Sequence, residues 1–174
     1  MSAPVDLRRF VRDVPDFPKP GILFRDVTPL LGDAAALAAA VEALAAPFRD
    51  RGVEKVMGIE SRGFVFGAPV AVALGTGLAL VRKAGKLPWR TRRVTYELEY
   101  GSDTVEMHED ALRPGERVLV VDDLIATGGT AAAAVRLARE AGAEVVGCAF
   151  LVELGALHGR TRLGVEDVHV LLSY

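Results

Sequence analysis

The sequence predicts an α/β protein with a mostly parallel central sheet flanked by helices. Short runs of β-branched and apolar residues recur along the 174-residue chain, and segments with helical periodicity separate several of them. Strands that alternate with helices imply right-handed crossover connections, which make neighbouring strands parallel and cover both faces of the sheet. The length suits one domain with a full hydrophobic core, and residues 1–174 are therefore expected to form a single domain.

The expected strands are short and mostly apolar. The clearest is RVLVVDD, which is β-branched and apolar until its last two residues. GCAFLV closes another run that is long enough to cross a core, and VEKVMGIE and LALVRK have the same character. In chain order, the sequence predicts strands at residues 53–60, 78–83, 117–123, 144–152 and 167–174.

Three helices are expected between these strands. The alanine-rich segment 33–50 begins at Asp33, whose side chain suits an N-cap. Residues 63–75 follow the first strand and keep a helical pattern despite containing glycine and proline. Residues 130–142 end on glycine, the residue that most often terminates helices.

Two segments depart from this alternation. Residues 15–32 contain four prolines and are expected to be loop-like. Residues 96–112 show period-two alternation on both sides of Gly101 and Ser102, which predicts a β-hairpin attached to the sheet.

Composition restricts the possible function classes. A net charge of −2 argues against nucleic acid as a main ligand, since that binding draws on a broad basic surface. No apolar run approaches the roughly 18 residues of a membrane span, and the first residues lack the apolar core of a signal peptide. We therefore expect no membrane association and a cytoplasmic location. The single cysteine, Cys148, lies in an apolar run and is expected to be a buried thiol.

The stretch VLVVDDLIATGGT (residues 118–130) is the strongest candidate for chemistry. Ligands of open α/β sheets bind where the strands end and turn into helices, and this stretch forms such a turn. Gly128 and Gly129 let backbone N–H groups face an anion, Thr127 and Thr130 add hydroxyl donors, and the following helix adds a positive N-terminus. Together these features predict a phosphate site.

Two acids precede this phosphate turn, and no common nucleotide fingerprint fits. Neither GxxxxGK[ST] nor a GxGxxG after a strand is present. Acceptors at Asp122 and Asp123 beside phosphate donors suggest a ligand with sugar hydroxyls next to a phosphate, such as a ribose 5-phosphate. The alternative is an ordinary turn with two solvated acids.

This ordered motif resembles the phosphoribosyl pyrophosphate (PRPP) motif of the type I phosphoribosyltransferases, which have a Rossmann-like fold. The resemblance implies that Asp122 and Asp123 hold the ribose hydroxyls. It implies that the 5-phosphate is held by Ala126, Thr127, Gly128, Gly129 and Thr130. Consecutive strand residues alternate faces, so which of the two acids contacts the ribose directly stays open.

Three further blocks resemble the adenine-specific members of that family: DFPKPGILFRDVTPLL, GIESRGFVFG and VRKAGKLPW. The first implies an N-terminal base-binding hood over residues 1–32, with adenine bound by Leu23, Phe24 and Arg25. Phe24 can stack on a purine, and backbone groups can match the donor and acceptor edge of adenine. Alternatively, the segment is a proline-rich cover loop with Phe24 in the core.

The pyrophosphate end of PRPP is assigned by the same resemblance. Arg62 follows a strand, and its planar guanidinium suits two phosphate oxygens, so we also expect it to assist catalysis. Lys83, Arg82 and Lys86 are the other candidates, although any of them could equally be solvated.

The hairpin is expected to be a mobile lid over residues 91–112, as the resemblance implies. Glu99 matches the acid that accepts a proton from the purine ring, and Tyr100 is expected to contact the closed site. A single exposed Glu is otherwise usually a solvated surface residue.

These assignments imply the reaction of adenine with PRPP to give AMP and pyrophosphate. Mg²⁺ is the expected cofactor, bound through PRPP and water rather than directly by the protein. The resemblance also implies a homodimer. Two alternatives remain: another purine, such as xanthine, as the base, and a PRPP-sensing transcription regulator. The regulator is disfavoured because the slightly acidic chain carries no basic face or added DNA-binding segment.

Overall fold

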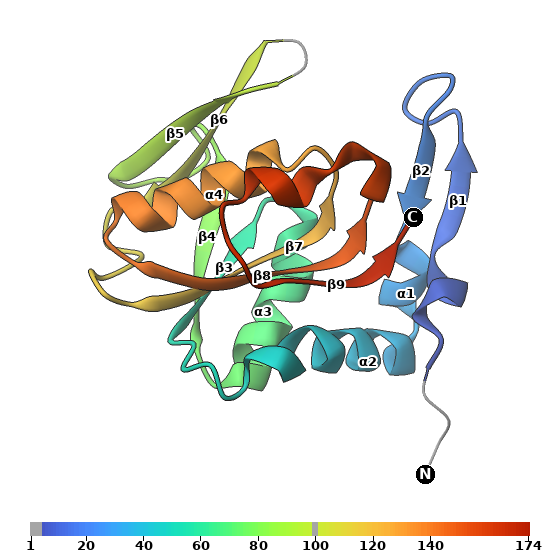
Figure 1. Cartoon of the computed structure of the whole chain (residues 1–174), viewed down its shortest axis with the longest axis horizontal. Coiled ribbons are helices and arrows are strands. Elements are labelled where there is room, and N and C mark those ends of the chain that lie inside the picture. Colours follow the sequence, from blue (N-terminus) through green and yellow to red (C-terminus); the bar gives the residue numbers. More distant parts are fainter. Residues whose placement is uncertain (1–4, 99–100) are drawn as a thin grey trace.

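A seven-stranded sheet with the order β5-β6-β4-β3-β7-β8-β9 forms the centre of the computed structural model, which describes residues 5–98 and 101–174. The architecture confirms the predicted fold class (Figure 1). The strands are β3 (Lys55–Ile59), β4 (Gly77–Lys83), β5 (Thr91–Glu97), β6 (Ser102–His108), β7 (Arg117–Ile125), β8 (Glu144–Glu153) and β9 (Val168–Ser173).

Five neighbouring strands of the sheet, β4, β3, β7, β8 and β9, are parallel to one another. The hairpin strands β6 and β5 extend the sheet in the antiparallel sense. Met57 of β3 lies opposite Ala79 on β4 and Val120 on β7. At the other edge, β6 pairs antiparallel with the end of β4, and β5 pairs with β6. The carboxyl ends of β4, β3 and β7 are therefore neighbours, and any site built there draws on three strands.

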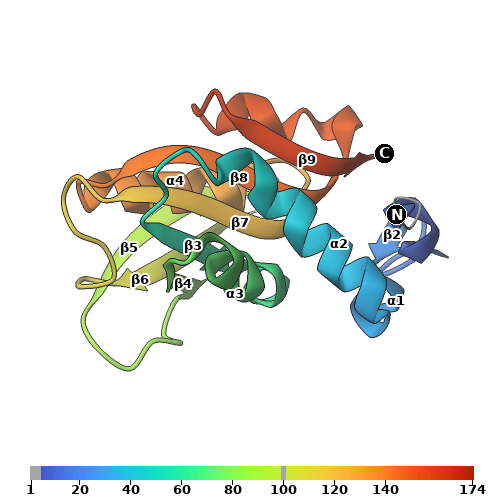
Figure 2. The ribbon, with the colours of Figure 1, turned by 90° about the horizontal axis from the view of Figure 1, so that it is seen from below.

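Helices cover both faces of this sheet. Figure 2 shows α2 (Ala34–Ala45) and α3 (Arg62–Leu74) on one face, whereas α4 (Gly129–Glu140) packs on the other. The helices α2 and α3 share one hydrophobic cluster, which includes the fully buried Phe66, and α4 packs on a second cluster, which includes the fully buried Leu137. Cys148 of β8 is fully buried as predicted, and burial raises its pKa to about 12.

The first long helix begins as expected but is shorter than its predicted range. Asp33 is the N-cap of α2, because its side chain accepts a hydrogen bond of 2.8 Å from the N–H of Ala36. The α-helix ends at Ala45 and continues only as a 3₁₀ turn, Ala46–Phe48. Pro47 lacks a backbone donor, which explains why the segment does not stay α-helical to residue 50.

The N-terminal region differs from the prediction. The loop expected over residues 15–32 contains regular structure, so that prediction was wrong. After a 3₁₀ turn, Leu7–Phe10, the strands β1 (Arg12–Pro15) and β2 (Leu23–Asp26) form a separate two-stranded sheet, and α1 (Thr28–Gly32) follows. Asp26 stabilises the start of α1 by accepting hydrogen bonds of 2.9 Å from both the N–H and the hydroxyl of Thr28.

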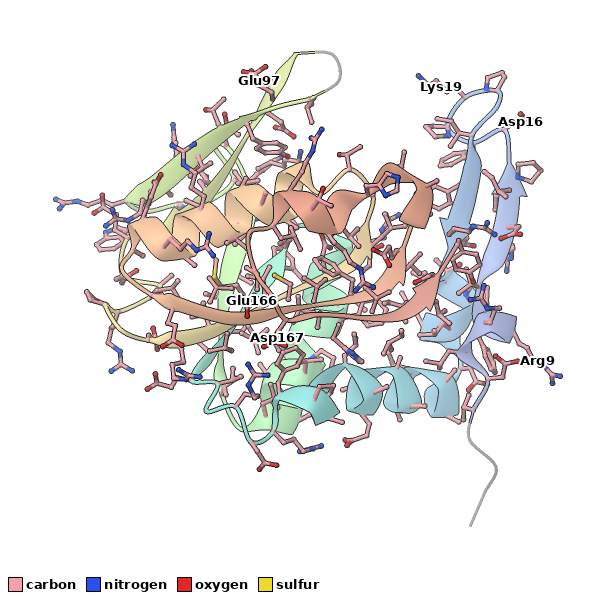
Figure 3. All side chains as sticks on the ribbon, in the orientation of Figure 1. Arg9, Asp16, Lys19, Glu97, Glu166 and Asp167 are labelled. Atoms are coloured by element: carbon pink, nitrogen blue, oxygen red, sulfur yellow. The ribbon has the colours of Figure 1, made fainter. Side chains whose placement is uncertain are left out.

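The β-hairpin is present and longer than predicted at its start. β5 begins at Thr91, and it pairs with β6 in a register that places Tyr96 opposite Asp103. Both the hairpin and the loop between β1 and β2 project from the same end of the molecule, where Glu97 and Lys19 lie (Figure 3).

The connection between β8 and β9 contains two 3₁₀ turns, Gly155–Leu157 and Gly159–Arg162, and the second lies beside the start of α4 (Figure 1). Across residues 5–98 and 101–174, none of the helices combines the length and the apolar character needed to cross a membrane.

Candidate functional site

A cleft of about 420 Å³ opens at the carboxyl ends of β3, β4 and β7. Its volume is in the range of small-molecule sites. Most of the residues predicted to bind the sugar, the phosphate and the pyrophosphate line this cleft, together with other residues at the ends of the same strands. The cleft is lined by Glu60, Ser61, Arg62, Lys83, Asp122, Asp123, Leu124, Ile125, Ala126, Thr127, Gly128, Gly129, Thr130 and Ala131.

The turn from β7 into α4 forms the floor of the cleft. Gly128 has a φ of +81°, a conformation that a residue with a side chain adopts only with strain. The first intrahelical bond runs from Ala132 N–H to the carbonyl of Gly128, so the N–H groups before Ala132 have no acceptor within the helix. These free N–H groups and the helix dipole make the turn suitable for a phosphate.

The two adjacent acids occupy different surroundings. Asp122 lies against the start of α3, where a Cβ on Gly63 would come within 2.7 Å of its Oδ1. Asp123 is only 6% exposed, and its Oδ2 forms an ion pair with Arg62 Nε at 2.6 Å. Burial and the neighbouring Asp123 carboxylate raise the pKa of Asp122 well above its usual value. The free protein therefore relieves part of the repulsion within the pair through the ion pair between Arg62 and Asp123.

This raised pKa predicts a pH-dependent stability. A carboxyl with a raised pKa in the folded state favours folding at pH values below its unfolded pKa of about 3.9, and this contribution is lost as pH rises through the folded pKa. The free energy of unfolding of the wild-type protein should therefore fall as pH rises through this range. We expect Asp122→Asn to remove that fall. Urea titrations at several pH values would measure it. Asp50→Asn, which removes an exposed acid, should keep the wild-type slope, and equal slopes in all three proteins would contradict the prediction.

Arg62 connects the cleft to the N-terminal sheet. Its guanidinium pairs with Asp123, and its Cζ lies 5.3 Å from the centroid of the Phe24 ring, within the range of a cation–π interaction. The predicted sugar site and the predicted base-binding segment are therefore adjacent in space, although about 100 residues separate them in the sequence.

The base-binding candidates all lie on β2. Leu23 is exposed, Phe24 packs edge-to-face against Phe17 at 5.1 Å between ring centroids, and Arg25 lies under the ring of Tyr174. Arg25 also pairs with Asp13 on β1. The side chain of Arg25 thus braces the two-stranded sheet against Tyr174 and Asp13.

Of the predicted cations at the end of β4, only Lys83 lines the cleft. Its ammonium group pairs with Asp103 of β6, and its backbone N–H donates to Glu60 at 2.9 Å. Arg82 instead bonds both oxygens of Glu60 and the carbonyl of Lys86. Arg82 and Lys86 therefore organise the loop after β4 and do not line the cleft.

Glu60 is a site residue that the sequence reasoning missed. Burial alone would raise its pKa, but hydrogen bonds from Lys83 N–H and Arg82 outweigh this effect and hold the pKa of Glu60 below its usual value. Its position at the end of a predicted strand, directly before Ser61 and Arg62, was the available signal.

Tyr96 is the second missed residue. Its hydroxyl lies 2.9 Å from the Thr130 hydroxyl and donates to Asp103 at 3.3 Å. Its ring packs on Gly129, where a Cβ would come within 3.3 Å of the ring. The end of β5 nearest the hairpin turn is thereby attached to the phosphate turn. The predicted lid residues Glu99 and Tyr100 lie outside the described residues.

The acids of the cleft do not form a metal site of their own. Among residues 5–98 and 101–174, no three His, Cys, Asp or Glu side chains are grouped so that they could hold a metal ion. Glu60 and Asp123 are instead engaged with Arg82 and Arg62. A divalent cation entering this cleft would have to take most of its oxygen ligands from a phosphorylated ligand and from water, which suits Mg²⁺.

Comparison with known proteins extends this picture to the whole chain. The phosphoribosyl transferase domain family matches residues 31–168. The adenine phosphoribosyltransferase of Anaeromyxobacter sp. (strain Fw109-5) is 55% identical over 175 residues, covering 100% of this chain and 99% of that protein.

Solved structures give the same result. The adenine phosphoribosyltransferase of Rhodothermus marinus has a TM-score of 0.92 at 55% identity, covering 97% of this chain and 96% of that chain. The Saccharomyces cerevisiae enzyme, complexed with D-2,5-dideoxy-2,5-imino-altritol 1,6-bisphosphate and adenine, has a TM-score of 0.90 at 40% identity, covering 95% and 96%. The likeness is therefore not confined to the central sheet.

Proposed function

This chain belongs to the phosphoribosyl transferase family, and from that membership we propose that it transfers the 5-phosphoribosyl group of PRPP to adenine, giving AMP and pyrophosphate. One observation supports this function above all others. The contact of Arg62 with both Asp123 and Phe24 joins a ribose-phosphate cradle to a base-binding strand. A reaction between a phosphoribosyl donor and a flat base requires that adjacency.

The 5-phosphate binds at the turn from β7 to α4, where the backbone N–H groups of residues 126–130 and the hydroxyls of Thr127 and Thr130 donate to it. Asp122 and Asp123 accept hydrogen bonds from the ribose hydroxyls. Arg62 leaves Asp123 when the ribose arrives, and its guanidinium then serves the pyrophosphate together with Lys83. Arg82 and Lys86 support this end of the site through the loop that they organise.

Adenine stacks on Phe24, and backbone groups of Leu23 and Arg25 bind its edge. A carbonyl and an N–H match the N6 donor and N1 acceptor of adenine. A 6-oxo purine reverses that pattern and leaves buried groups unpaired, at a cost of about 1–3 kcal/mol per group. The site therefore selects adenine.

The chemical step depends on positioning and electrostatics. Mg²⁺, when bound to PRPP, neutralises negative charge that develops on the leaving pyrophosphate. Arg62 and Lys83 add positive charge at the same end, while C1′ becomes oxocarbenium-like and N9 of adenine attacks from the opposite face. Glu99 accepts the N9 proton. Residues 91–112 close as a lid with Tyr100 at its tip, which excludes water from the reactive sugar.

Residues 1–174 act as one domain in which residues 1–32 form the hood, and the enzyme works in the cytoplasm as a homodimer. Support for the dimer comes from Val65 and Val72, which lie two turns apart on α3 and are 42% and 81% exposed. We expect Val72→Asp to convert the dimer to a monomer, measured by sedimentation velocity. The exposed substitution Glu109→Gln is the control, and a wild-type monomer would contradict the prediction.

Tyr96 offers a separate test of the 5-phosphate end. Tyr96→Phe keeps the ring on Gly129 but removes the hydrogen bonds of the hydroxyl to Thr130 and Asp103, of which the bond to Thr130 contributes about 0.5–1.5 kcal/mol. We expect the KM for PRPP to rise about 2- to 12-fold, with the KM for adenine unchanged. Thr95→Val is the control, because Thr95 bonds Thr104 on the same hairpin and is no part of the cleft lining. An unchanged KM for PRPP in Tyr96→Phe would refute this role.

Purified protein incubated with radiolabelled PRPP and a panel of bases tests the function directly. We expect AMP from adenine, dependence on Mg²⁺, and little product from hypoxanthine or xanthine. Turnover of hypoxanthine without turnover of adenine would overturn the assignment.

A further inference from the structure

The phosphate turn is in backbone contact with a segment that carries none of the site residues named above. This segment is the second 3₁₀ turn, Gly159–Arg162, of the connection from β8 to β9. A Cβ on Gly128 would lie 2.2 Å from the carbonyl oxygen of Gly159, and a Cβ on Gly159 would lie 2.3 Å from the carbonyl oxygen of Ala126 and 3.0 Å from the N atom of Gly128. Two glycines thus face each other across the contact.

The partner atoms in this contact are mostly backbone atoms, so no change of side-chain rotamer could make room for a methyl group there. The backbone of Gly159 itself does not have a positive φ, unlike that of Gly128. Alanine could therefore adopt the local conformation at residue 159. The absence of a side chain at Gly159 serves the close approach to the turn, not the shape of its own loop.

An ion pair holds Gly159 in this position. Arg160 donates from Nε and Nη2 to the two oxygens of Glu153, at 2.5 and 2.8 Å, and from Nη1 to the carbonyl of Val168. Glu153 is 8% exposed and also accepts from the Ser173 hydroxyl. It ends β8 directly opposite Ile125, the last residue of β7 before the turn.

We propose that Gly159, held in place by the Arg160–Glu153 ion pair, is a positioning residue that sets the shape of the 5-phosphate turn. Residues 126–128 are supported from behind by this loop, so that their N–H groups keep the arrangement that a phosphate requires. The inference rests on the proposed function. It assigns the β8–β9 connection a role in the affinity for phosphoribosyl ligands, specific to the 5-phosphate end.

Gly159→Ala tests the inference. We expect at least a tenfold rise in the Kd of ribose 5-phosphate, measured by calorimetry, and in the KM values of PRPP and AMP. The KM values of adenine and of pyrophosphate should stay within twofold, because the nearest atoms to a side chain at residue 159 belong to residues 125–128, not to β2 or Lys83. A general loss of structure would raise all of these values together.

Gly155→Ala is the matched control. Gly155 lies in the same connection, and a Cβ there would meet only the carbonyl oxygen of Tyr174 at 3.5 Å, an ordinary contact. This variant should keep wild-type constants. Arg160→Met removes the ion pair without adding a clash, and we expect the same selective loss, smaller in size. If Gly159→Ala does not fold, Arg160→Met decides by the same constants, and Arg160→Lys should recover part of the affinity.

Wild-type affinity for ribose 5-phosphate in Gly159→Ala, or equal losses for pyrophosphate and PRPP, would overturn the inference. The proposed function fails in a different way. A wild-type protein that binds ribose 5-phosphate but makes no AMP would contradict the function alone, and the binding comparison among the variants would still test the role of Gly159.

Discussion

Replacing Asp122 and Asp123 together by asparagine should lower kcat/KM for PRPP by about 10²- to 10⁴-fold. Each carboxylate accepts a hydrogen bond from a ribose hydroxyl in the proposed complex, and hydrogen bonds to charged groups contribute about 1.5–3 kcal/mol each. Two such losses together amount to about 3–6 kcal/mol. Every loss of about 1.4 kcal/mol lowers kcat/KM tenfold. Steady-state kinetics with PRPP as the varied substrate would measure the change.

The double variant should nevertheless stay folded. Asparagine keeps the shape of the Asp122 side chain and removes a negative charge that burial and the neighbouring Asp123 disfavour. Arg62 loses the partner at Asp123, but its side chain is 46% exposed and can be solvated. Glu109→Gln with Asp110→Asn is the control, since these two adjacent acids are exposed and lie outside the cleft. Near-normal turnover in the Asp122 and Asp123 variant would refute the ribose role.

Replacing Glu106 by leucine should lower the free energy of unfolding by about 3–5 kcal/mol, the range for breaking a buried charged network. Glu106 lies on β6 with no solvent exposure. It accepts hydrogen bonds from the N–H groups of Lys86 and Leu87, at 3.1 and 3.0 Å, and from Arg93 Nε at 2.9 Å. Leucine has a similar volume but leaves these buried donors without an acceptor.

A series at this position separates charge from hydrogen bonding. Burial alone would raise the pKa of Glu106, but N–H donors at Leu87 and Gly85, with Arg93, hold it below its usual value. The stabilisation is present above the unfolded pKa of about 4.3 and is lost as pH falls through the folded pKa. Glu106→Gln keeps an acceptor and should lose less than Glu106→Leu in urea denaturation at pH 7. Equal stability of wild type and Glu106→Leu would contradict this view.

The central sheet was predictable because its strands are apolar runs separated by clear helical patterns. The N-terminal segment was not, because its signals are local and short. Four prolines suggested a loop, yet Pro15 ends an edge strand, where its missing donor costs nothing, and Asp26 with Pro29 starts a helix turn. Strands of four residues in a separate two-stranded sheet have too little periodicity to be recognised.

For the site, the sequence identified the residues that end strands or form the glycine-rich turn. It could not distinguish Lys83, which lines the cleft, from Arg82, which bonds Glu60. Both residues end the same strand and their side chains point to opposite faces, but the sequence does not show which face borders the cleft. Tyr96 and Gly159 were missed for another reason. Their contacts with Thr130 and Gly128 depend on how the hairpin and the β8–β9 connection pack against the turn, and no local pattern encodes that packing.

The buried thiol of Cys148 has a practical consequence for labelling. With no solvent exposure and a pKa of about 12, it presents almost no thiolate to alkylating reagents at neutral pH. The natural protein therefore already serves as an unreactive background for attaching probes. Cysteines introduced at Glu97 on the hairpin and at Lys19 on the hood loop (Figure 3) would carry a pair of spin labels. The distance between them, recorded with and without ribose 5-phosphate, would report closure of the site in solution.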